Sequence, residues 1–336
     1  MRVARIARRL AATGMLMLGA ATFVFILMRA IPGDPVDAIL GREGNVNPAQ
    51  VALIREQFQL DRPLPEQLAS FYGRMLRGDL GTSIVRQRPV TELIGERLPA
   101  TIELALGAFL LALVVALPVG VLSAVRQRSA LDRGAMAAAF VGMSMPPFWL
   151  GIVLILLFAV RLQWLPVAGR IAYGYAPAEM TGLYTLDALL SLDPAAFIDT
   201  LRHLALPAVT LGAVLAALIA RVSRSSMLEV LREEYVRTAR AKGLAERVVI
   251  VRHALRNALI PLVTVIGLEV GALLGGNMIV ETVFEWPGIG RLAVEAIFAR
   301  DYPLVQGVVI VYAFTFAAAN FVVDIFYTLV NPRLEL

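Results

Sequence analysis

Residues 100–125 read ATIELALGAFLLALVVALPVGVLSAV, and this stretch decides the class of fold. Glu103 is its single charged residue, and the stretch exceeds the roughly 20 apolar residues that a helix needs to cross a bilayer. In hydrocarbon the backbone must satisfy its own hydrogen bonds, which favours a helix for such a block. The period-2 alternation of a membrane β-barrel strand is missing. The stretch therefore predicts a membrane-spanning helix.

The same pattern recurs along the chain. Of its 336 residues, 58% are hydrophobic and 17% charged, whereas a soluble domain is nearer half apolar and a quarter charged. Prolines inside the apolar blocks predict kinks that pack against neighbouring helices. We therefore expect an all-α, polytopic membrane protein with six transmembrane helices. The predicted spans are Leu10–Ile31, Ala100–Val125, Gly134–Val160, Leu204–Ala220, Ala258–Val280 and Pro303–Val330.

The first apolar block follows four arginines and has a competing interpretation as a cleavable signal peptide. The apolar region of a signal peptide runs for about 7–15 residues. Here the apolar run continues to Met28 before it meets Arg29. We favour an uncleaved first span.

Basic residues predict the orientation of the chain in the membrane. They gather in the N-terminus, in the loop after the second span (Arg126, Arg128 and Arg133) and in residues 221–256. Six spans put these three regions on one face, and short loops rich in arginine stay in the cytoplasm. Both termini are then cytoplasmic, with residues 32–99, 161–203 and 281–302 outside. Because the charge serves orientation, the net charge of +5 does not indicate nucleic acid.

The chain lacks the residues of common catalytic and cofactor sites. It has no cysteine and two isolated histidines, which argues against thiolate or histidine metal sites. A nucleotide-binding P-loop needs Gly-Lys-Ser/Thr, but the single lysine, Lys242, is followed by Gly243. The nucleophile elbow G-x-S-x-G around Ser144 fails at Pro146. We therefore expect no enzyme, no metal and no cofactor in this chain.

Residues 221–261 form the most informative loop, RVSRSSMLEVLREEYVRTARAKGLAERVVIVRHALRNALIP. Leu228, Leu231, Tyr235 and Ala239 recur at helical spacing, and Gly243 suits a helix C-terminus. The small residues Ala239 and Gly243 would let a partner's backbone approach. The residues alone leave two interpretations open: a helix on the membrane surface, with arginines facing anionic lipid, or a helix presented to a cytoplasmic partner.

The segment YVRTARAKGL at 235–244 resembles the "EAA" loop of binding-protein-dependent ABC importer permeases, in the form of the peptide branch. Of the general EAA-x3-G pattern it keeps Ala239 and Gly243. Further segments resemble the dipeptide/oligopeptide permease family, "B" subunit type, along nearly the whole chain. They are RAIPGDP at 29–35, GDLG at 78–81, RSSMLE at 224–229, ETVFEWPGIG at 281–290, RDYP at 300–303 and NPR at 331–333.

This resemblance implies a type I ABC importer permease in a bacterial plasma (inner) membrane. It implies a complex with a second homologous permease subunit, two ABC ATPase subunits that hold ATP and Mg²⁺, and an external or periplasmic solute-binding protein. The solute would be a di- or oligopeptide, although permeases of this type also carry nickel chelates and glutathione. The ATPase would dock at Tyr235, Ala239, Arg240, Lys242 and Gly243.

The resemblance divides the chain into residues 1–96, a first helix with an external loop, then 97–330, the transmembrane domain, and a cytoplasmic tail, 331–336. The docking loop lies at 223–258. The rival to an ATP-driven permease is a secondary transporter, which needs no ATPase and is expected to show inverted repeats or broken helices around a charged midplane site.

Ionisable residues inside spans are candidates for a solute pathway. Glu269 lies near the middle of the fifth span and could meet a peptide's ammonium group or bridge helices, and Asn277 lies in the same span. Glu103 lies near a span end, where we expect water or an interfacial group as its partner. Glu285, Trp286, Pro287 and Gly288 are expected to form an outer gate hairpin; the alternative is an interfacial anchor built on Trp286.

Overall fold

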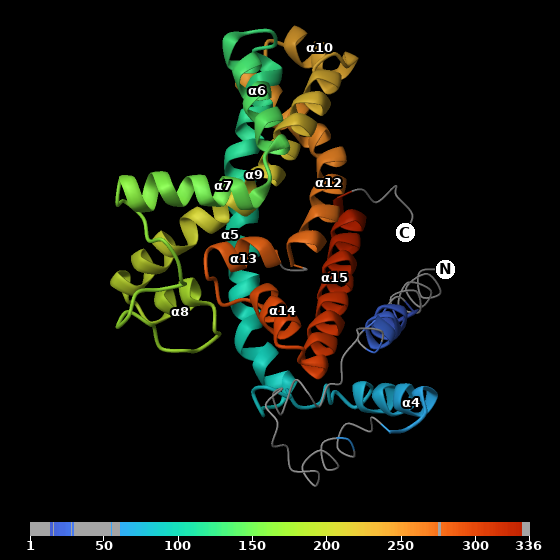
Figure 1. The fold of residues 1–336 in the computed structure, drawn as a ribbon. Helices are drawn as coiled ribbons and strands as arrows, with labels where there is room; N and C mark the ends of the chain where they lie inside the picture. Colours follow the sequence, from blue (N-terminus) through green and yellow to red (C-terminus); the bar gives the residue numbers. More distant parts are fainter. Residues whose placement is uncertain are drawn as a thin grey trace. The chain divides into compact units, whose positions relative to one another are not determined.

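Helices make up the regular structure of the chain (Figure 1). The computed structural model describes residues 14–15, 17–27, 29, 55, 61–274 and 277–330, and within them the only β pairing is an isolated bridge between Thr82 and Pro89. The predicted all-α class is confirmed. The helices after Met17–Leu27 are α4 (Leu64–Met75), α5 (Val90–Val125), α6 (Ala130–Ser144), α7 (Pro147–Leu154), η1 (Ile155–Arg161), α8 (Tyr184–Leu190), α9 (Pro194–Val230), α10 (Glu234–Ala241), α11 (Glu246–Val248), η2 (Val249–Leu255), α12 (Arg256–Leu274), α13 (Met278–Val283), α14 (Ile289–Phe298) and α15 (Tyr302–Val330).

Within the described residues, four helices are long and apolar enough to cross a membrane, or five if the bent pair α6–α7/η1 counts as one span. The predicted second, fourth and sixth spans lie inside α5, α9 and α15. α5 begins at Val90 and α9 at Pro194, well before the predicted starts. Of the predicted first span, Met17–Leu27 is a described helix and much of the rest lies outside the described residues.

The predicted third span, Gly134–Val160, is wrong as a single helix. The chain turns by 109° between Ser144 and Pro147. Two consecutive prolines cause the break, because each lacks a backbone N–H and each restricts the residue before it to extended conformations. Met145 is accordingly extended, with φ −83° and ψ 130°, and Pro147 starts the next helix.

The predicted fifth span also ends differently. α12 stops at Leu274, so the predicted end at Val280 falls in the separate helix α13. Asn277 caps α13, since its side-chain oxygen accepts a hydrogen bond from the Val280 N–H at 3.0 Å. Asn277 therefore begins a short helix and does not lie within a span.

The chain divides into two compact units, and the division falls inside α5 and α15. One unit comprises residues 1–99 and 288–315, and the other comprises 100–287 and 316–336. The predicted domains, 1–96 and 97–330, divide the chain by function and stay a prediction.

The core of the larger unit rests on close contact between α5 and α9. Ala108, Ala112 and Ala116 line α5 at every fourth position and are buried. A Cβ on Gly212 would lie 2.8 Å from the Ala108 carbonyl oxygen, and one on Gly120 would lie 2.6 Å from that of Ala220. Small residues at this spacing let two membrane helices bring their backbones together. α5 and α9 therefore form a closely packed pair.

In the smaller unit a buried carboxylate fixes the loop that precedes α5. Asp301 is 1% exposed. It accepts hydrogen bonds from the Ser83 hydroxyl and from the backbone N–H groups of Ile84 and Val85, at 3.1 and 3.2 Å. A carboxylate that receives several hydrogen bonds offsets much of its desolvation. The residues that follow GDLG, 83–85, and the segment RDYP thus belong to one structural feature.

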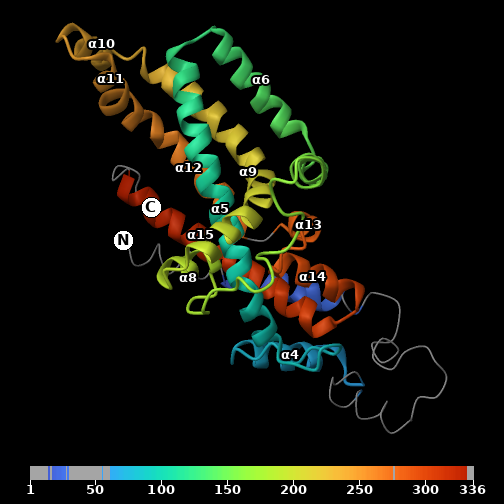
Figure 2. The same ribbon diagram turned by 90° about the vertical axis from the view of Figure 1, so that its left-hand side faces the viewer.

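Two basic loops share one end of the larger unit. The turn between α5 and α6 carries Arg126 and Arg128, and it lies at the same end as α10 in both views (Figures 1 and 2). α8 lies toward the opposite end. Within this unit, the predicted gathering of basic loops on one face agrees with the structure.

Candidate functional site

The candidate site centres on α10, a short helix at the basic end of the larger unit. The predicted stripe from Leu228 to Ala239 does not lie on one helix, because α9 ends at Val230 and α10 starts at Glu234. Leu228 instead packs with the cluster around Ala124 and Met227. A turn between the helices redirects the chain, and α10 forms a separate projecting element.

The buried face of α10 is apolar and packs on the chain itself. Val236 and Ala239 form a small cluster with Val249 of η2, and these side chains are 0%, 5% and 0% exposed. Ala239 therefore lies beneath the helix rather than on its exposed surface. Its small size serves the approach of α10 to η2, which differs from the predicted direct approach of a partner.

Gly243 ends α10, as the sequence predicts. Its φ is +76°, in the left-handed region that glycine adopts without strain. Its N–H donates to the Arg240 carbonyl at 2.9 Å, and the N–H of Lys242 donates to Thr238 at 3.1 Å. These bonds satisfy carbonyls at the helix C-terminus. A Cβ on Gly243 would meet nothing within 4 Å, so the backbone conformation, and not crowding, calls for glycine.

Two side-chain links tie α10 to the helix that follows. The Asn257 amide donates to the Tyr235 hydroxyl at 2.7 Å, and Arg240 pairs with Glu246 at 2.7 Å. Tyr235 is 40% exposed, and Lys242, Gly243 and Leu244 are exposed beside it. The four predicted docking residues other than Ala239 are thus all exposed, on α10 and at its C-terminus.

The predicted outer segment is fixed against α5. Trp286 is fully buried, and its indole N–H donates to the Ala100 carbonyl at 2.7 Å. The interfacial-anchor alternative is therefore wrong for Trp286. The buried carboxylate of Glu281 accepts a hydrogen bond from Thr101 at 2.8 Å. Glu285 is exposed with φ +48°, Pro287 is partly buried, and Gly288 is buried at the start of α14.

A buried ion pair that the sequence did not predict lies near this segment. Glu103 pairs with Arg170 at 2.7 Å, and their side chains are 2% and 7% exposed. Of the two expected partners, water is wrong, because Glu103 is buried against an arginine. Its other oxygen accepts from the Thr185 N–H and hydroxyl at 2.7 and 2.8 Å. The Arg170 guanidinium stacks over the Tyr184 ring at 3.8 Å and lies 6.0 Å from the Trp286 ring centre. The two residues are 67 positions apart in the sequence, and no local sequence pattern indicates that they pair.

Glu269 lies on the face of α12 that also carries Leu262, Ile266 and Leu273. Those three side chains pack in the core that α5 and α9 form, and Glu269 is partly buried. Among the described residues it has no hydrogen-bond or ion-pair partner that would fix its role. Glu269 as a solute contact stays a prediction.

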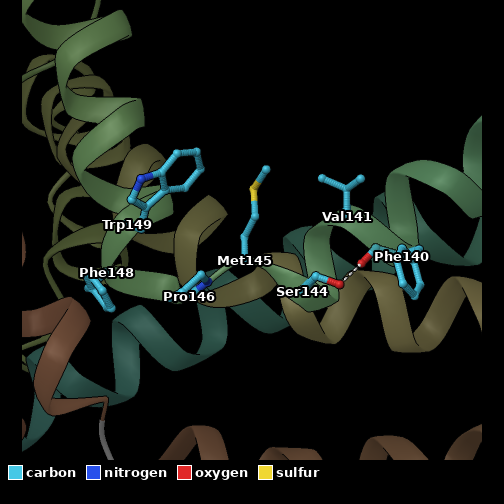
Figure 3. A pocket seen from close by; sticks show the side chains of 7 residues that line it. All are labelled: Phe140, Val141, Ser144, Met145, Pro146, Phe148 and Trp149. Carbon is cyan, nitrogen blue, oxygen red and sulfur yellow. Dashed lines mark hydrogen bonds between the residues drawn. The ribbon is translucent and has the colours of Figure 1, made fainter.

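An apolar hollow lies at the bend between α6 and α7, but none of its lining side chains is charged (Figure 3). Its one side-chain hydroxyl, that of Ser144, already donates to the Phe140 carbonyl at 2.9 Å. The hollow therefore offers no charged side chain to pair with a peptide's charged terminus. Its lining residues are Phe140, Val141, Ser144, Met145, Pro146, Phe148 and Trp149.

Comparison with known proteins gives concordant results. The family described as binding-protein-dependent transport system inner membrane component matches residues 116–336, and the corresponding N-terminal family matches residues 3–105. The chain is 46% identical over 330 residues to the di/tripeptide transport system permease protein DppB of Pseudomonas aeruginosa, covering 98% of each chain. It is 42% identical over 333 residues to the dipeptide transport system permease protein DppB of Escherichia coli, again covering 98% of each.

A solved structure shows a similar fold. A chain of the MetNI methionine ABC transporter, in an inward-facing conformation, matches with a TM-score of 0.50 at 20% identity, covering 71% of this chain and 96% of that chain. At this identity the likeness concerns the fold alone. The expected type I importer fold is confirmed.

Proposed function

The chain belongs to the family of binding-protein-dependent transport system inner membrane components, and we propose that it forms half of the translocation pathway of an ATP-driven importer of di- or oligopeptides. It is a multi-pass protein of the inner membrane. A second, homologous permease subunit completes the pathway. Alternating access moves the solute, and nucleotide acts by favouring one of two conformational states over the other.

The exposed stretch of α10 is the observation that carries this proposal. Tyr235, Arg240, Lys242 and Gly243 are exposed, and α10 is joined through Asn257 and Glu246 to the helix that continues into α12. A partner that pulls on α10 therefore pulls on a membrane helix. Two ABC ATPase subunits hold the ATP and Mg²⁺, and one of them docks on this surface.

The basic end of the larger unit faces the cytoplasm. Arginine-rich loops are retained on that side, and α10 shares this end with the α5–α6 turn. Both chain termini then lie inside, and an external or periplasmic binding protein delivers the solute on the opposite side.

The similarity to the two DppB proteins supports a peptide as the solute. Glu269, a partly buried carboxylate on α12, is a candidate contact for a peptide's ammonium group, and Asn277 lies near it in sequence. Glutathione and nickel chelates are the alternatives. Competition for uptake of a labelled dipeptide by unlabelled dipeptide, glutathione or nickel chelate separates them.

A pair of glycine variants tests the docking site. Gly243→Asp places a charge on the proposed ATPase surface, and Gly174→Asp is the matched control. Both glycines have φ between +76° and +87°, and a Cβ on either meets nothing within 4 Å. The backbone strain is therefore similar, but Gly174 lies outside α10, in the loop before α8.

We expect Gly243→Asp to reach the membrane and to lose most ATP-dependent uptake, while Gly174→Asp keeps uptake near wild type. Uptake by right-side-out vesicles and ATP hydrolysis by the purified complex provide the two readouts. Normal uptake by Gly243→Asp would overturn the docking assignment. Uptake that needs no ATPase subunit would favour a secondary transporter.

A further inference from the structure

α8 and the first turns of α9 form a corner whose exposed side chains are all apolar. Leu192, at the tip, is 85% exposed, and Leu189 and Ile198 are 57% and 56% exposed. The opposite sides of both helices are buried, and the two helices pack against each other. The exposed residues of this apolar corner, residues 186–201, are Leu186, Leu189, Leu190, Leu192, Pro194, Ala195, Ile198 and Leu201.

All three carboxylates of the apolar corner have hydrogen-bond partners within the protein. Asp187 is fully buried and accepts hydrogen bonds from the Thr181 N–H and hydroxyl and from the Gly182 N–H. Asp193 caps α9, accepting from two backbone N–H groups at 3.0 Å. Asp199 accepts from the Ala172 N–H at 2.7 Å. Asp187 is therefore shielded completely, and Asp193 and Asp199 are partly buried and held by bonds within the protein.

The backbone at the tip holds Leu192 outward in an unusual conformation. Its φ is +54°, in the left-handed region, which a bulky residue rarely adopts. In the segment between η1 and α8, Gly169, Gly174 and Gly182 have left-handed φ, and so does Gln163, at +53°. Glycine would adopt this conformation without strain, and the tip instead carries a leucine that is 85% exposed.

The apolar corner continues into a membrane helix without a break. α9 runs for 37 residues, or about 55 Å at 1.5 Å per residue, whereas a bilayer with its headgroups measures about 40–45 Å. The first turns of α9 must therefore lie at or near an interface. α8 lies beside this end of α9 in both views (Figures 1 and 2). Arg202, which follows the corner, is exposed and can reach lipid phosphates.

We propose that the apolar corner lies in the lipid interface at the N-terminal end of α9, with Leu189, Leu192 and Ile198 among the acyl chains. In-plane amphipathic segments of this kind bury one apolar face at the boundary between headgroups and acyl chains. A protein-binding surface would be expected to carry tyrosine, tryptophan or arginine, and the exposed residues of the corner are aliphatic or proline. Lipid anchorage fixes the depth of α8 and of the start of α9.

Site-directed spin labelling tests the proposal directly, because the natural chain has no cysteine. Leu189→Cys, Leu192→Cys and Ile198→Cys are labelled one at a time in the full-length chain, with its co-purifying subunits, in nanodiscs of phosphatidylethanolamine and phosphatidylglycerol. Collision with oxygen, which concentrates in lipid, is compared with collision with a water-soluble nickel complex. Phe140→Cys, on α6 and 73% exposed, is the lipid reference, and Glu179→Cys, in the loop before α8, is the aqueous reference.

For each label we compare the ratio of its collision rate with oxygen to its collision rate with the nickel complex. We expect this ratio at all three positions to be at least severalfold higher than at Glu179→Cys and to approach the ratio at Phe140→Cys. Labels as accessible to nickel as that at Glu179 would overturn the proposal. Labels shielded from both reagents would also overturn it, because they would place the corner in a protein interface. An impermeant maleimide applied to intact cells gives a second measurement, with slower modification expected at Leu192→Cys than at Glu179→Cys.

Discussion

Replacing Arg170 with methionine tests whether the buried ion pair holds the region beside Trp286 in place. Methionine keeps an unbranched apolar stem and removes the guanidinium. Glu103 would lose its 2.7 Å partner, and the Gly182 carbonyl would lose its 2.6 Å donor. The two hydrogen bonds from Thr185 to Glu103 would remain, and so the carboxylate would stay buried without a counter-charge.

The magnitude follows from the burial of both partners. Removing one partner of a buried ion pair costs about 3–5 kcal/mol, and the lost stacking on Tyr184 contributes up to about 2 kcal/mol. These terms overlap, so we expect a loss of about 4 kcal/mol in the free energy of unfolding. On the scale of soluble domains of 150–250 residues, this lowers the unfolding midpoint by roughly 10 °C.

The assay is thermal unfolding in detergent, followed by tryptophan fluorescence. Arg202→Met is the matched control, since Arg202 is exposed on α9 and a surface change of this kind is usually worth less than about 0.5 kcal/mol. The double variant Glu103→Gln with Arg170→Met should regain at least half of the loss, because its buried pair no longer contains an unbalanced charge. A loss below about 1 kcal/mol for Arg170→Met, or a double variant as unstable as the single one, would refute the reasoning.

Three further predictions concern packing, a buried carboxylate and pH. Gly212→Ala should destabilise the protein by about 1–3 kcal/mol, because its methyl group would lie 2.8 Å from the Ala108 carbonyl oxygen. The control Gly142→Ala, whose methyl group would have its nearest atoms at 3.8 Å, should be neutral or stabilising. Equal unfolding midpoints for the two variants would contradict the close α5–α9 contact. Asp301→Asn should cost about 3 kcal/mol, because an NH2 group replaces one carboxylate oxygen and leaves a donor such as the buried Ser83 hydroxyl without its acceptor. A midpoint like that of the exposed control Asp79→Asn would count against the role of Asp301. Burial alone would raise the pKa of Asp187, but hydrogen bonds from Thr181 and Gly182 outweigh it and hold the pKa below its ordinary value. The stability that Asp187 contributes is therefore complete above pH about 4 and is lost as the pH falls through the lower folded-state pKa. The difference in unfolding midpoint between wild type and Asp187→Asn should shrink only in that acid range. A difference that stays constant there would contradict the lowered pKa.

The sequence predicted the helical class and most of the spans because bilayer-length apolar blocks leave few alternatives to helices. It also predicted the helix end at Gly243, since a glycine after a helical stripe signals a left-handed cap. Both signals are local: each depends on residues within one helix or its cap.

The sequence-based predictions failed where the structure depends on contacts between residues that are far apart in the sequence. Pro146 and Pro147 indicated a kink, but its size, 109°, depends on what the two arms pack against. Glu103 gave no sign of its partner, because Arg170 lies in a segment expected to be an external loop. Ala239 was expected to let a partner's backbone approach, whereas in the fold it packs against Val249 of η2.

Cross-linking from Lys242 tests most directly whether ATP hydrolysis by a partner acts through α10. Lys242→Cys carries a photoactivatable group in the assembled complex in native membranes, with Glu179→Cys as the control outside α10. We predict that the Lys242 position captures a polypeptide that binds and hydrolyses ATP, and that the Glu179 position does not. Capture of lipid alone from Lys242, in membranes that still import the solute, would contradict the account.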